Sequence, residues 1–269
     1  MCLILIAYKQ SARFPLVVAA NRDEYYARPT APAAFWKDAP GVLAGRDLTG
    51  GGTWLGITRG GRFAAVTNFR GPGTNRADAP TRGALVSEYL RGHAPPVSYL
   101  DAVAGRGAAY NGFNLVAADT GQLCWYSNRD GPPRVLGPGV YGISNHLLDT
   151  PWPKVMRAKS KLSAWLAHDD GRAGGLLDML ADRTEADGAA LPDTGVGRER
   201  ERVLSPIFIC SDNYGTRSST VLIIDAGGHV AFTERSYAPD AELTGTVSLE
   251  FDLVTAGAAQ SRRAGAAAV

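Results

Sequence analysis

The sequence predicts an α+β protein in which two mainly antiparallel sheets are covered by helices. Strand-like segments gather near both ends and in the middle of the 269-residue chain, and helix-like segments come as two separated pairs. This order does not alternate as it would in a doubly wound parallel sheet. The length is that of one large domain, so we expect a single domain over residues 1–255 and a disordered Ala-, Gly- and Arg-rich tail over 256–269.

The first half of the chain opens with two short apolar runs that predict a β-hairpin whose strands are buried on both faces. The stretch that holds Pro29, Pro32 and Pro40 is expected to be irregular, and a second hairpin turns at Arg59-Gly60-Gly61. The predicted elements are strands at 2–8, 15–20, 53–58 and 62–67, followed by helices at 81–90 and 97–104.

The second half adds another block of strands, a second pair of helices and a final block of strands. A polar, glycine-containing loop over 185–197 separates the helices from the final strands. The predicted strands are 112–119, 122–127, 140–144, 207–210, 218–224, 229–236 and 246–253, and the predicted helices are 153–166 and 175–180.

Composition and charge exclude several classes of protein. The 28 basic and 26 acidic residues give a formal net charge of +2 and form no long run of like charge, so we expect no nucleic-acid partner. The opening apolar run is far shorter than the ~20 residues that span a bilayer, which predicts no transmembrane segment and, without leader features, a cytoplasmic location. Three cysteines predict no disulfide framework, and four scattered histidines predict no metal site.

Cys2 is the candidate nucleophile. Removal of the initiator methionine would leave one residue that carries both a thiol and a free α-amine, whose unperturbed pKa is about 7.7–8.0. Such an amine can act as the general base for its own side chain near neutral pH, and a thiol is a better nucleophile than a hydroxyl. The alternative is a buried strand cysteine that acts as a small hydrophobic residue.

The predicted first hairpin places a polar sequence beside Cys2. With a turn centred near residues 11 and 12, antiparallel pairing sets Cys2 opposite about residue 21, where Asn21-Arg22-Asp23-Glu24 lies. A cation such as Arg22 would lower the pKa of the thiol, and a carboxylate such as Asp23 would hold the α-amine by a charge-assisted hydrogen bond. The alternative is a charged strand end exposed to water.

That tetrapeptide and several other motifs resemble the NRDE proteins, the family of transport and Golgi organisation protein 2 homologues. More distantly, the chain resembles the cysteine-type N-terminal-nucleophile amidases, such as bile-salt hydrolases, penicillin V acylases and ceramidase relatives. In those amidases an Arg and an Asp from the next strand flank the terminal Cys, although with two residues between them rather than none. The stretches that match the NRDE family are Met1-Cys2-Leu3-Ile4, 20–29, Ala44-Gly45-Arg46-Asp47, Gly51-Gly52-Thr53-Trp54-Leu55-Gly56, Val66-Thr67-Asn68-Phe69-Arg70 and Tyr214-Gly215-Thr216-Arg217-Ser218-Ser219-Thr220.

These resemblances imply a four-layer αββα sandwich of the N-terminal-nucleophile hydrolase type. They also imply two oxyanion donors, each typically worth about 2.7–4 kcal/mol, and a late arginine that anchors the nucleophile's network. The alternative for each asparagine is a turn-forming role, and the alternative for the arginine is an exposed position at the start of a strand. The implied catalytic residues are Cys2, Arg22 and Asp23, with Asn68 and Asn145 as oxyanion donors and Arg217 as the anchor.

A glycine run and several aromatic residues suggest where a ligand meets the site. No Gly-Lys-Ser/Thr follows the run 50–52, which excludes a P-loop, so we expect these glycines to allow close approach of a substrate or cofactor. Trp36, Tyr25 and Tyr26 are further candidates for an apolar pocket, with core packing as the alternative. The candidate substrate contacts are Asn21, Trp54, Phe69 and His146.

Three functions fit the sequence. The first is an amidohydrolase that acts on non-peptide C–N bonds, in which Cys2 attacks an amide of a small or lipid-like substrate and no cofactor is required. The second, implied by the NRDE resemblance, is a non-catalytic carrier of haem or an acyl lipid in haem trafficking or lipid homeostasis, with His146 as a candidate axial ligand of haem. The third is a trafficking or scaffold protein. The expected partner is a small-molecule or lipid-like ligand, and the sequence assigns no oligomeric state.

Overall fold

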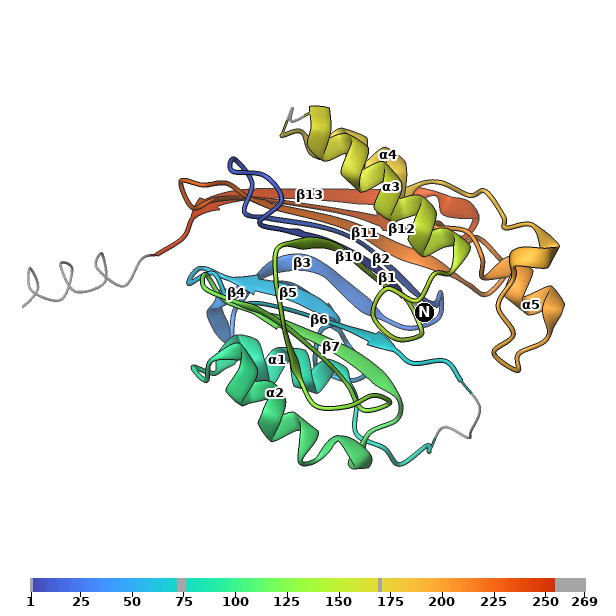
Figure 1. Ribbon diagram of the computed structural model, residues 1–269, viewed down its shortest axis with the longest axis horizontal. Coiled ribbons are helices and arrows are strands. Elements are labelled where there is room, and N and C mark those ends of the chain that lie inside the picture. The colour runs from blue at the N-terminus through green and yellow to red at the C-terminus, as the bar shows by residue number, and fades with distance from the viewer. Residues whose placement is uncertain (1, 72–75, 169–170, 255–269) are drawn as a thin grey trace, which may run out of the picture.

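Two antiparallel sheets pack face to face, and a pair of helices covers the outer face of each (Figure 1). The computed structural model describes residues 2–71, 76–168 and 171–254. The layers follow the order helix, sheet, sheet, helix. The predicted α+β class and the αββα sandwich are therefore confirmed.

The first sheet carries Cys2 on an inner strand. Its six strands lie in the order β10-β1-β2-β11-β12-β13. Because β1 pairs with β2 on one side and with β10 on the other, two neighbours hold the strand that begins at Cys2. The strands are β1 (Cys2–Tyr8), β2 (Leu16–Tyr25), β10 (Gly139–Ile143), β11 (Tyr214–Ile224), β12 (His229–Tyr237) and β13 (Leu243–Asp252).

The second sheet has seven strands that follow one another in chain order, from β3 to β9. Its central strand β6 ends at Asn68 and contacts β1 of the first sheet. The strands are β3 (Thr30–Trp36), β4 (Ala39–Asp47), β5 (Leu55–Thr58), β6 (Phe63–Asn68), β7 (Phe113–Ala118), β8 (Leu123–Ser127) and β9 (Arg134–Leu136).

Each helix pair packs on one sheet. The helices α3 (Pro153–His168) and α4 (Ala173–Leu180) contact strands of the first sheet, and α1 (Gly83–Arg91) and α2 (Pro96–Ala104) contact strands of the second. A short helix, α5 (Arg198–Val203), lies apart from both pairs (Figure 1). Among the described residues, no helix is long and apolar enough to cross a membrane.

Alternation along β1 divides its side chains between two cores. Ile4 and Ile6 belong to the core between the sheets, while Leu3 and Leu5 belong to the core under α3 and α4. All four are at most 3% exposed, and full burial of such a side chain contributes about 1.5–3 kcal/mol. By the same alternation, Cys2 lies on the side of the first sheet that faces the second sheet.

The proline-containing stretch is ordered into β3 and β4, so the predicted irregular region is wrong. Pro32 lies between Ala31 and Ala34, where the strand register shifts, and Pro40 is the second residue of β4. Proline cannot donate to a sheet ladder, but β3 is an edge strand and the shifted register leaves room for that loss.

Other local predictions also differ from the structure. The apolar run 207–210 does not form the predicted strand: Cys210 makes an isolated bridge with Gly215, while Ile207 and Ile209 fill the core from a loop. The three-residue strand β9 and the charged six-residue helix α5 were not predicted, because neither shows an apolar period. The predicted disordered tail over 256–269 lies outside the described residues.

The first hairpin pairs one residue away from the predicted register. Cys2 lies opposite Arg22, and Asn21 lies opposite Leu3. Because side chains alternate along a strand, this single step moves Asn21 to the helix-covered face and brings Arg22 to the face that carries Cys2.

Asn21 is therefore not a substrate contact, contrary to the prediction. Its Nδ2 donates to the carbonyl oxygens of Leu180 and Ile207 at 2.8 and 2.9 Å, and its Oδ1 accepts from Ser219 Oγ at 2.6 Å. These bonds tie β2 to the end of α4, to the loop at 207 and to β11. The amide is 99% buried, so water cannot replace these partners.

We predict that Asn21→Ala lowers the free energy of unfolding by about 2–4 kcal/mol, because it leaves buried carbonyl and hydroxyl groups without partners. Urea denaturation followed by circular dichroism measures the change. The matched control is Asn213→Ala, an exposed asparagine, which should change stability by less than about 0.5 kcal/mol. Equal stability of the two variants would contradict the structural role of Asn21.

Candidate active site

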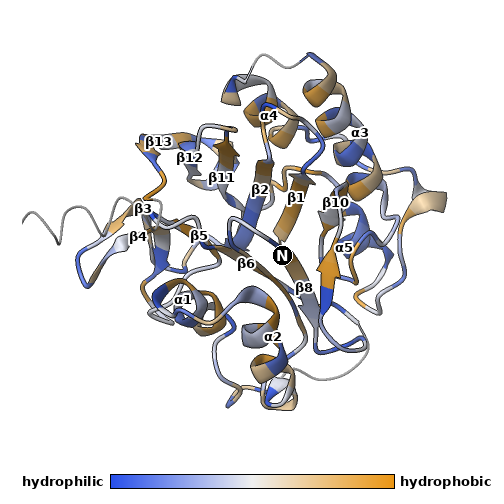
Figure 2. Cartoon of the chain, turned by 60° about the vertical axis from the view of Figure 1, so that its left-hand side comes forward, coloured by the Kyte–Doolittle hydropathy of each residue, from blue (hydrophilic) through white to orange (hydrophobic). Residues whose placement is uncertain are grey.

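Cys2 lines a polar cavity of about 330 Å³. The cavity lies where β1 begins and where β2 and β6 end, and its walls include Trp54 and the segment before α1. Figure 2 shows β2 changing from hydrophobic to hydrophilic toward the end that lies beside the start of β1. Ser144, which follows β10, donates its hydroxyl to the carbonyl oxygen of Cys2 at 3.1 Å. Cys2 is thus held from β2 and from the end of β10.

Arg22 faces Cys2 directly across the hairpin. Its guanidinium lies over the ring of Trp54 at 4.4 Å, and its Nη1 donates to Thr30 Oγ1 at 3.0 Å. Stacking on an indole and one hydrogen bond hold the flat guanidinium in place. The structure therefore brings together Cys2, Arg22 and Trp54, all three of which were singled out from the sequence.

The surroundings of Cys2 disfavour the ionised thiolate form of its side chain. Burial raises the pKa of the Cys2 thiol above its ordinary value, and the negative charge of Asp23 raises it further. The positive charge of Arg22 and a hydrogen bond from the backbone of Asp23 act in the opposite direction. Since burial is the largest effect, the thiol is mostly protonated at neutral pH and needs a base to remove its proton.

Asp23 lines the same cavity but approaches from the helix-covered side of β2. Its Oδ1 accepts from Thr216 Oγ1 at 2.7 Å, and its carbonyl oxygen accepts from the hydroxyl of Tyr214 at 2.9 Å. Burial raises the pKa of the Asp23 carboxyl, while the positive charge of Lys154 and the bond from Thr216 lower it. Two strands, β2 and β11, thus fix this carboxylate at the end of the sheet.

Lys154 is a buried cation near Asp23 that the sequence reasoning missed. It is 2% exposed, and its Nζ donates to the carbonyl oxygen of Leu204 at 2.9 Å. Burial lowers the pKa of Lys154 to about 8, and the negative charge of Asp23 partly offsets this effect. A signal was present, because Lys154 belongs to the buried stripe of α3 that also holds Val155, Ala158 and Leu162.

Arg82 is a second cation that the sequence reasoning missed. It lines the Cys2 cavity just before α1, and its Nη1 donates to the carbonyl oxygen of Gly112 at 3.2 Å. Burial lowers the pKa of Arg82, and the proximity of the Cys2 thiolate raises it. An isolated arginine at a helix start carries no special pattern, so only the folded chain reveals its place in the Cys2 cavity.

Asn68 and Asn145 lie next to each other but in different environments. Asn68 lines the Cys2 cavity, whereas Asn145 is fully buried and is not among the lining residues. Asn145 Nδ2 donates to the carbonyl oxygen of Asn68 at 2.9 Å, and the carbonyl oxygen of Asn145 accepts from Arg70 N at 2.6 Å. The side chain of Asn145 therefore holds the end of β6, and Asn68 is the one of the two that lines the Cys2 cavity.

Three other predicted site residues lie away from the Cys2 cavity. Arg217 sits where the register between β2 and β11 shifts, and its Nη1 donates to the carbonyl oxygens of Tyr25, Tyr26 and Arg28. It therefore braces the turn after β2, and it lines a neighbouring cavity together with Arg22 and Trp54. Phe69 packs against His146 with ring centroids 4.8 Å apart, and neither residue lines the cavity.

The glycine run allows close backbone approach, as predicted, but the approaching group is the chain itself. A Cβ on Gly52 would lie 2.6 Å from the backbone of Gly83 at the start of α1. Gly51 has a φ of +71°, which favours glycine. The run thus packs the segment before Trp54 against α1.

The described residues do not favour a haem or metal site built on His146. Its Nδ1 hydrogen bonds with Thr150 Oγ1 at 2.9 Å, and its ring lies between Phe69 and Trp152. Among the described residues there is no group of three or more His, Cys, Asp or Glu side chains that could hold a metal ion. The role of His146 as an axial ligand of haem stays a prediction.

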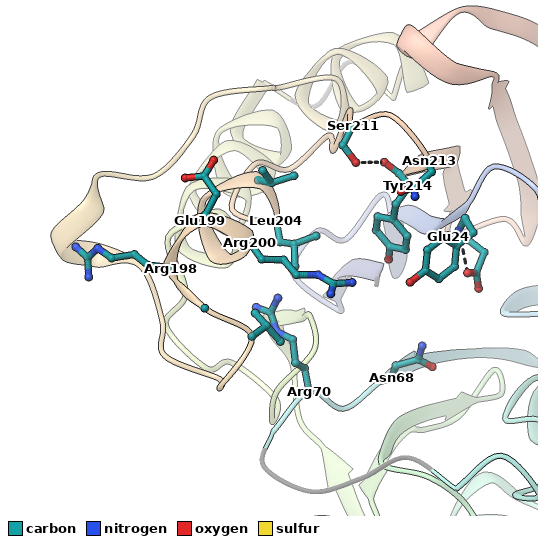
Figure 3. A pocket seen from close by; sticks show the side chains of 14 residues that line it. Glu24, Asn68, Arg70, Arg198, Glu199, Arg200, Leu204, Ser211, Asn213 and Tyr214 are labelled. Atoms are coloured by element: carbon teal, nitrogen blue, oxygen red, sulfur yellow. Dashed lines mark hydrogen bonds between the residues drawn. The ribbon is translucent and has the colours of Figure 1, made fainter.

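A larger groove of about 930 Å³ lies beside the Cys2 cavity and shares Glu24 and Asn68 with it. Figure 3 shows the side chain of Asn68 pointing into this groove, with Tyr214 on the opposite wall. The segment 196–204, which includes α5, forms another wall. Of the aromatic residues considered from the sequence, Tyr25 lines the groove and Trp36 belongs to the core under α1 and α2.

Together, the fold and the site form an αββα sandwich in which a cysteine begins an inner strand, beside an arginine and an aspartate of the next strand.

The chain belongs to the Transport and Golgi organisation 2 family, whose family model matches residues 1–239. The homologue from Bos taurus is 40% identical over 259 residues, which cover 88% of this chain and 93% of that protein. The homologue from Homo sapiens is 38% identical over 261 residues, with the same coverage. The protein from Drosophila melanogaster is 28% identical over 262 residues, which cover 88% of this chain and 92% of that protein. The resemblance to the NRDE family is thus confirmed.

Solved structures that resemble this chain have very different sequences. An N-acylethanolamine-hydrolyzing acid amidase orthologue from Caenorhabditis elegans has a TM-score of 0.49 and 12% identity, and covers 82% of this chain and 92% of that chain. The C2A mutant of the conjugated bile acid hydrolase from Clostridium perfringens has a TM-score of 0.49 and 9% identity, and covers 94% and 92%.

We predict that Arg22→Met shifts the pH profile of Cys2 alkylation to higher pH. Loss of the positive charge raises the thiol pKa, so less thiolate is present at a given pH, and at pH 8 the rate should fall about three- to tenfold. The rate of reaction with iodoacetamide, measured by mass spectrometry in a Cys210→Ser background that removes the exposed cysteine, gives the profile.

The control for this measurement is Arg106→Gln, which removes an exposed arginine paired with Glu88. It should leave the midpoint of the profile unchanged. An unchanged midpoint in Arg22→Met would show that Arg22 does not act on the thiol.

Proposed function

We propose that the protein is an N-terminal-nucleophile amidohydrolase in which Cys2, freed by removal of Met1, attacks an amide of a small or lipid-like substrate. The observation that carries the proposal is the pairing of Cys2 with Arg22 at the wall of a polar cavity that Asp23 also lines. The three groups come from two adjacent strand ends, which is the rigid kind of support that a catalytic constellation needs.

The chemistry follows from the state of the thiol. Because burial raises the pKa of the Cys2 thiol, attack requires a base, and the α-amine of the same residue would accept the proton. The sulfur then forms a bond to the amide carbon, and the carbonyl oxygen becomes an oxyanion. Asn68, which lines the same cavity, would donate to that oxygen.

Collapse of the tetrahedral intermediate breaks the C–N bond, and the protonated α-amine gives its proton to the departing nitrogen. An acyl thioester on Cys2 remains. Water, deprotonated by the same amine, attacks the thioester carbon and releases the carboxylic acid and the free thiol. Arg22 would stabilise the negative charge that develops on sulfur in both steps. Asp23 would stabilise the ammonium form of the amine through a charge-assisted hydrogen bond.

A carrier of a lipid-like ligand is the second candidate. Two observations favour it: the groove beside Cys2 is much larger than the Cys2 cavity, and burial keeps the thiol protonated. Such a protein would bind an amphipathic molecule across the groove without forming a bond to sulfur. For either function, the free cysteines suit a reducing compartment such as the cytoplasm.

We predict that Cys2→Ala abolishes amide hydrolysis, with a loss of at least about a thousandfold in kcat/KM, because no other group in the cavity can form the thioester. A panel of acyl anilides with chains of different length, read by release of aniline, measures turnover. The control is Cys210→Ser, which removes an exposed cysteine and should retain full activity.

Intact mass of the purified protein decides whether the α-amine of Cys2 is free. The proposed mechanism requires loss of Met1. A retained Met1, or equal turnover by wild type and Cys2→Ala, would contradict it, while binding of the anilides without turnover would support the carrier.

A further inference from the structure

The groove beside the Cys2 cavity combines an apolar wall with charged groups. Tyr25 and Tyr214 contact each other edge to face, with centroids 5.2 Å apart, and both line the groove together with Val203 and Leu204. These side chains can cover a hydrocarbon or aromatic body. The groove is the larger of the two cavities that meet at Asn68, so it suits the larger half of a substrate.

Arg200 is the cation that projects into this groove. Figure 3 shows its side chain reaching from α5 into the space between Tyr214 and Arg70. Its neighbours on α5 are engaged, since Arg198 donates to Gly188 O and Arg202 pairs with Glu199. Within the described part of the chain, no hydrogen bond or ion pair engages the guanidinium of Arg200.

Arg70 lies on the inner side of the same groove. Its Nη2 bonds to Glu201 Oε2 at 2.8 Å, and its guanidinium lies over the ring of Trp152 at 4.9 Å. The carboxylate of Glu201 balances one positive charge, and the adjacent Arg200 adds a second positive charge. Two guanidinium groups with one carboxylate behind them leave one positive charge at the groove wall.

We propose that this wall is a subsite for a single carboxylate, held by Arg200 with Arg70 behind it, and that the ligand is an amphipathic amide whose larger half ends in that carboxylate. The proposed function sets the position of the amide at Cys2, and the subsite rests on it to that extent. The preference for a carboxylate is a binding property of the groove alone. Glu24 and Glu199 also line the groove, but each lies beside an arginine: Glu24 is 3.8 Å from Arg28, and Glu199 is 2.6 Å from Arg202.

The test compares one acid with its own ester. Suberic acid monoanilide carries a carboxylate at the far end of an eight-carbon chain, and its methyl ester has the same shape without the charge. Isothermal titration of the Cys2→Ala protein measures both affinities without turnover. We expect the acid to bind about tenfold tighter than the ester, as for a partly exposed charge-assisted hydrogen bond.

Arg200→Gln in the same background should reduce this preference to about one, and Arg200→Lys should retain part of it. The control is Arg202→Gln, a variant of the paired arginine on the same helix, which should keep the full preference. Equal affinity for acid and ester, a preference that survives Arg200→Gln, or no binding of either compound at millimolar concentration would each overturn the subsite.

Hydrolysis of the same anilide by the wild-type protein tests the amidohydrolase separately. A carboxylate preference that depends on Arg200, without hydrolysis, would support the subsite and contradict the enzyme. Hydrolysis without such a preference would support the enzyme and contradict the subsite.

Discussion

The antiparallel pairing of β1 with β2, which sets Cys2 opposite Arg22, is the constraint on which the site depends. β1 is an inner strand with a core on each side, so its register cannot slip by one residue without exchanging Leu3 and Ile4 between the two cores. The hydrophobic packing of the whole sandwich therefore holds the distance between a thiol and a guanidinium. Ser144 and Asn145, which follow β10, hold the backbone of Cys2 and of the neighbouring β6 end from a third side.

Burial at this strand end determines the electrostatics of the site. It raises the pKa of the Cys2 thiol and of the Asp23 carboxyl, and it lowers the pKa of Arg22 and Lys154. Each shift favours the neutral form, and each is opposed by the charge of a neighbour. Shifts of this kind, caused by burial and opposed by neighbouring charges, are typical of functional sites. The neighbouring groove has the opposite character, because it is wide and has exposed arginines along α5.

The strands could be predicted from short-range patterns because the order of apolar and turn-forming residues follows the burial and the backbone conformation of each position. The same rules failed where tertiary structure overrides local preference. Pro32 is tolerated because β3 is an edge strand with a shifted register, and the run at Ile207 and Ile209 is apolar because it fills a core from a loop. The environments of Asn21 and Arg217 could not be predicted for a similar reason: hydrogen bonds to buried groups and to turn carbonyls engage their side chains.

The sequence by itself determined two antiparallel sheets covered by helices, the cysteine at position 2, and the position of Arg22 and Asp23 near it, because these depend on strand periodicity and on a single hairpin. Only the tertiary structure decided which face each of these side chains occupies, since one residue of register reverses the faces. It also decided that Lys154, Arg82, Arg70 and Arg200 gather around the cavity and the groove. Those residues come from segments far apart in the chain, and only the packing of two sheets and the loop around α5 brings them together.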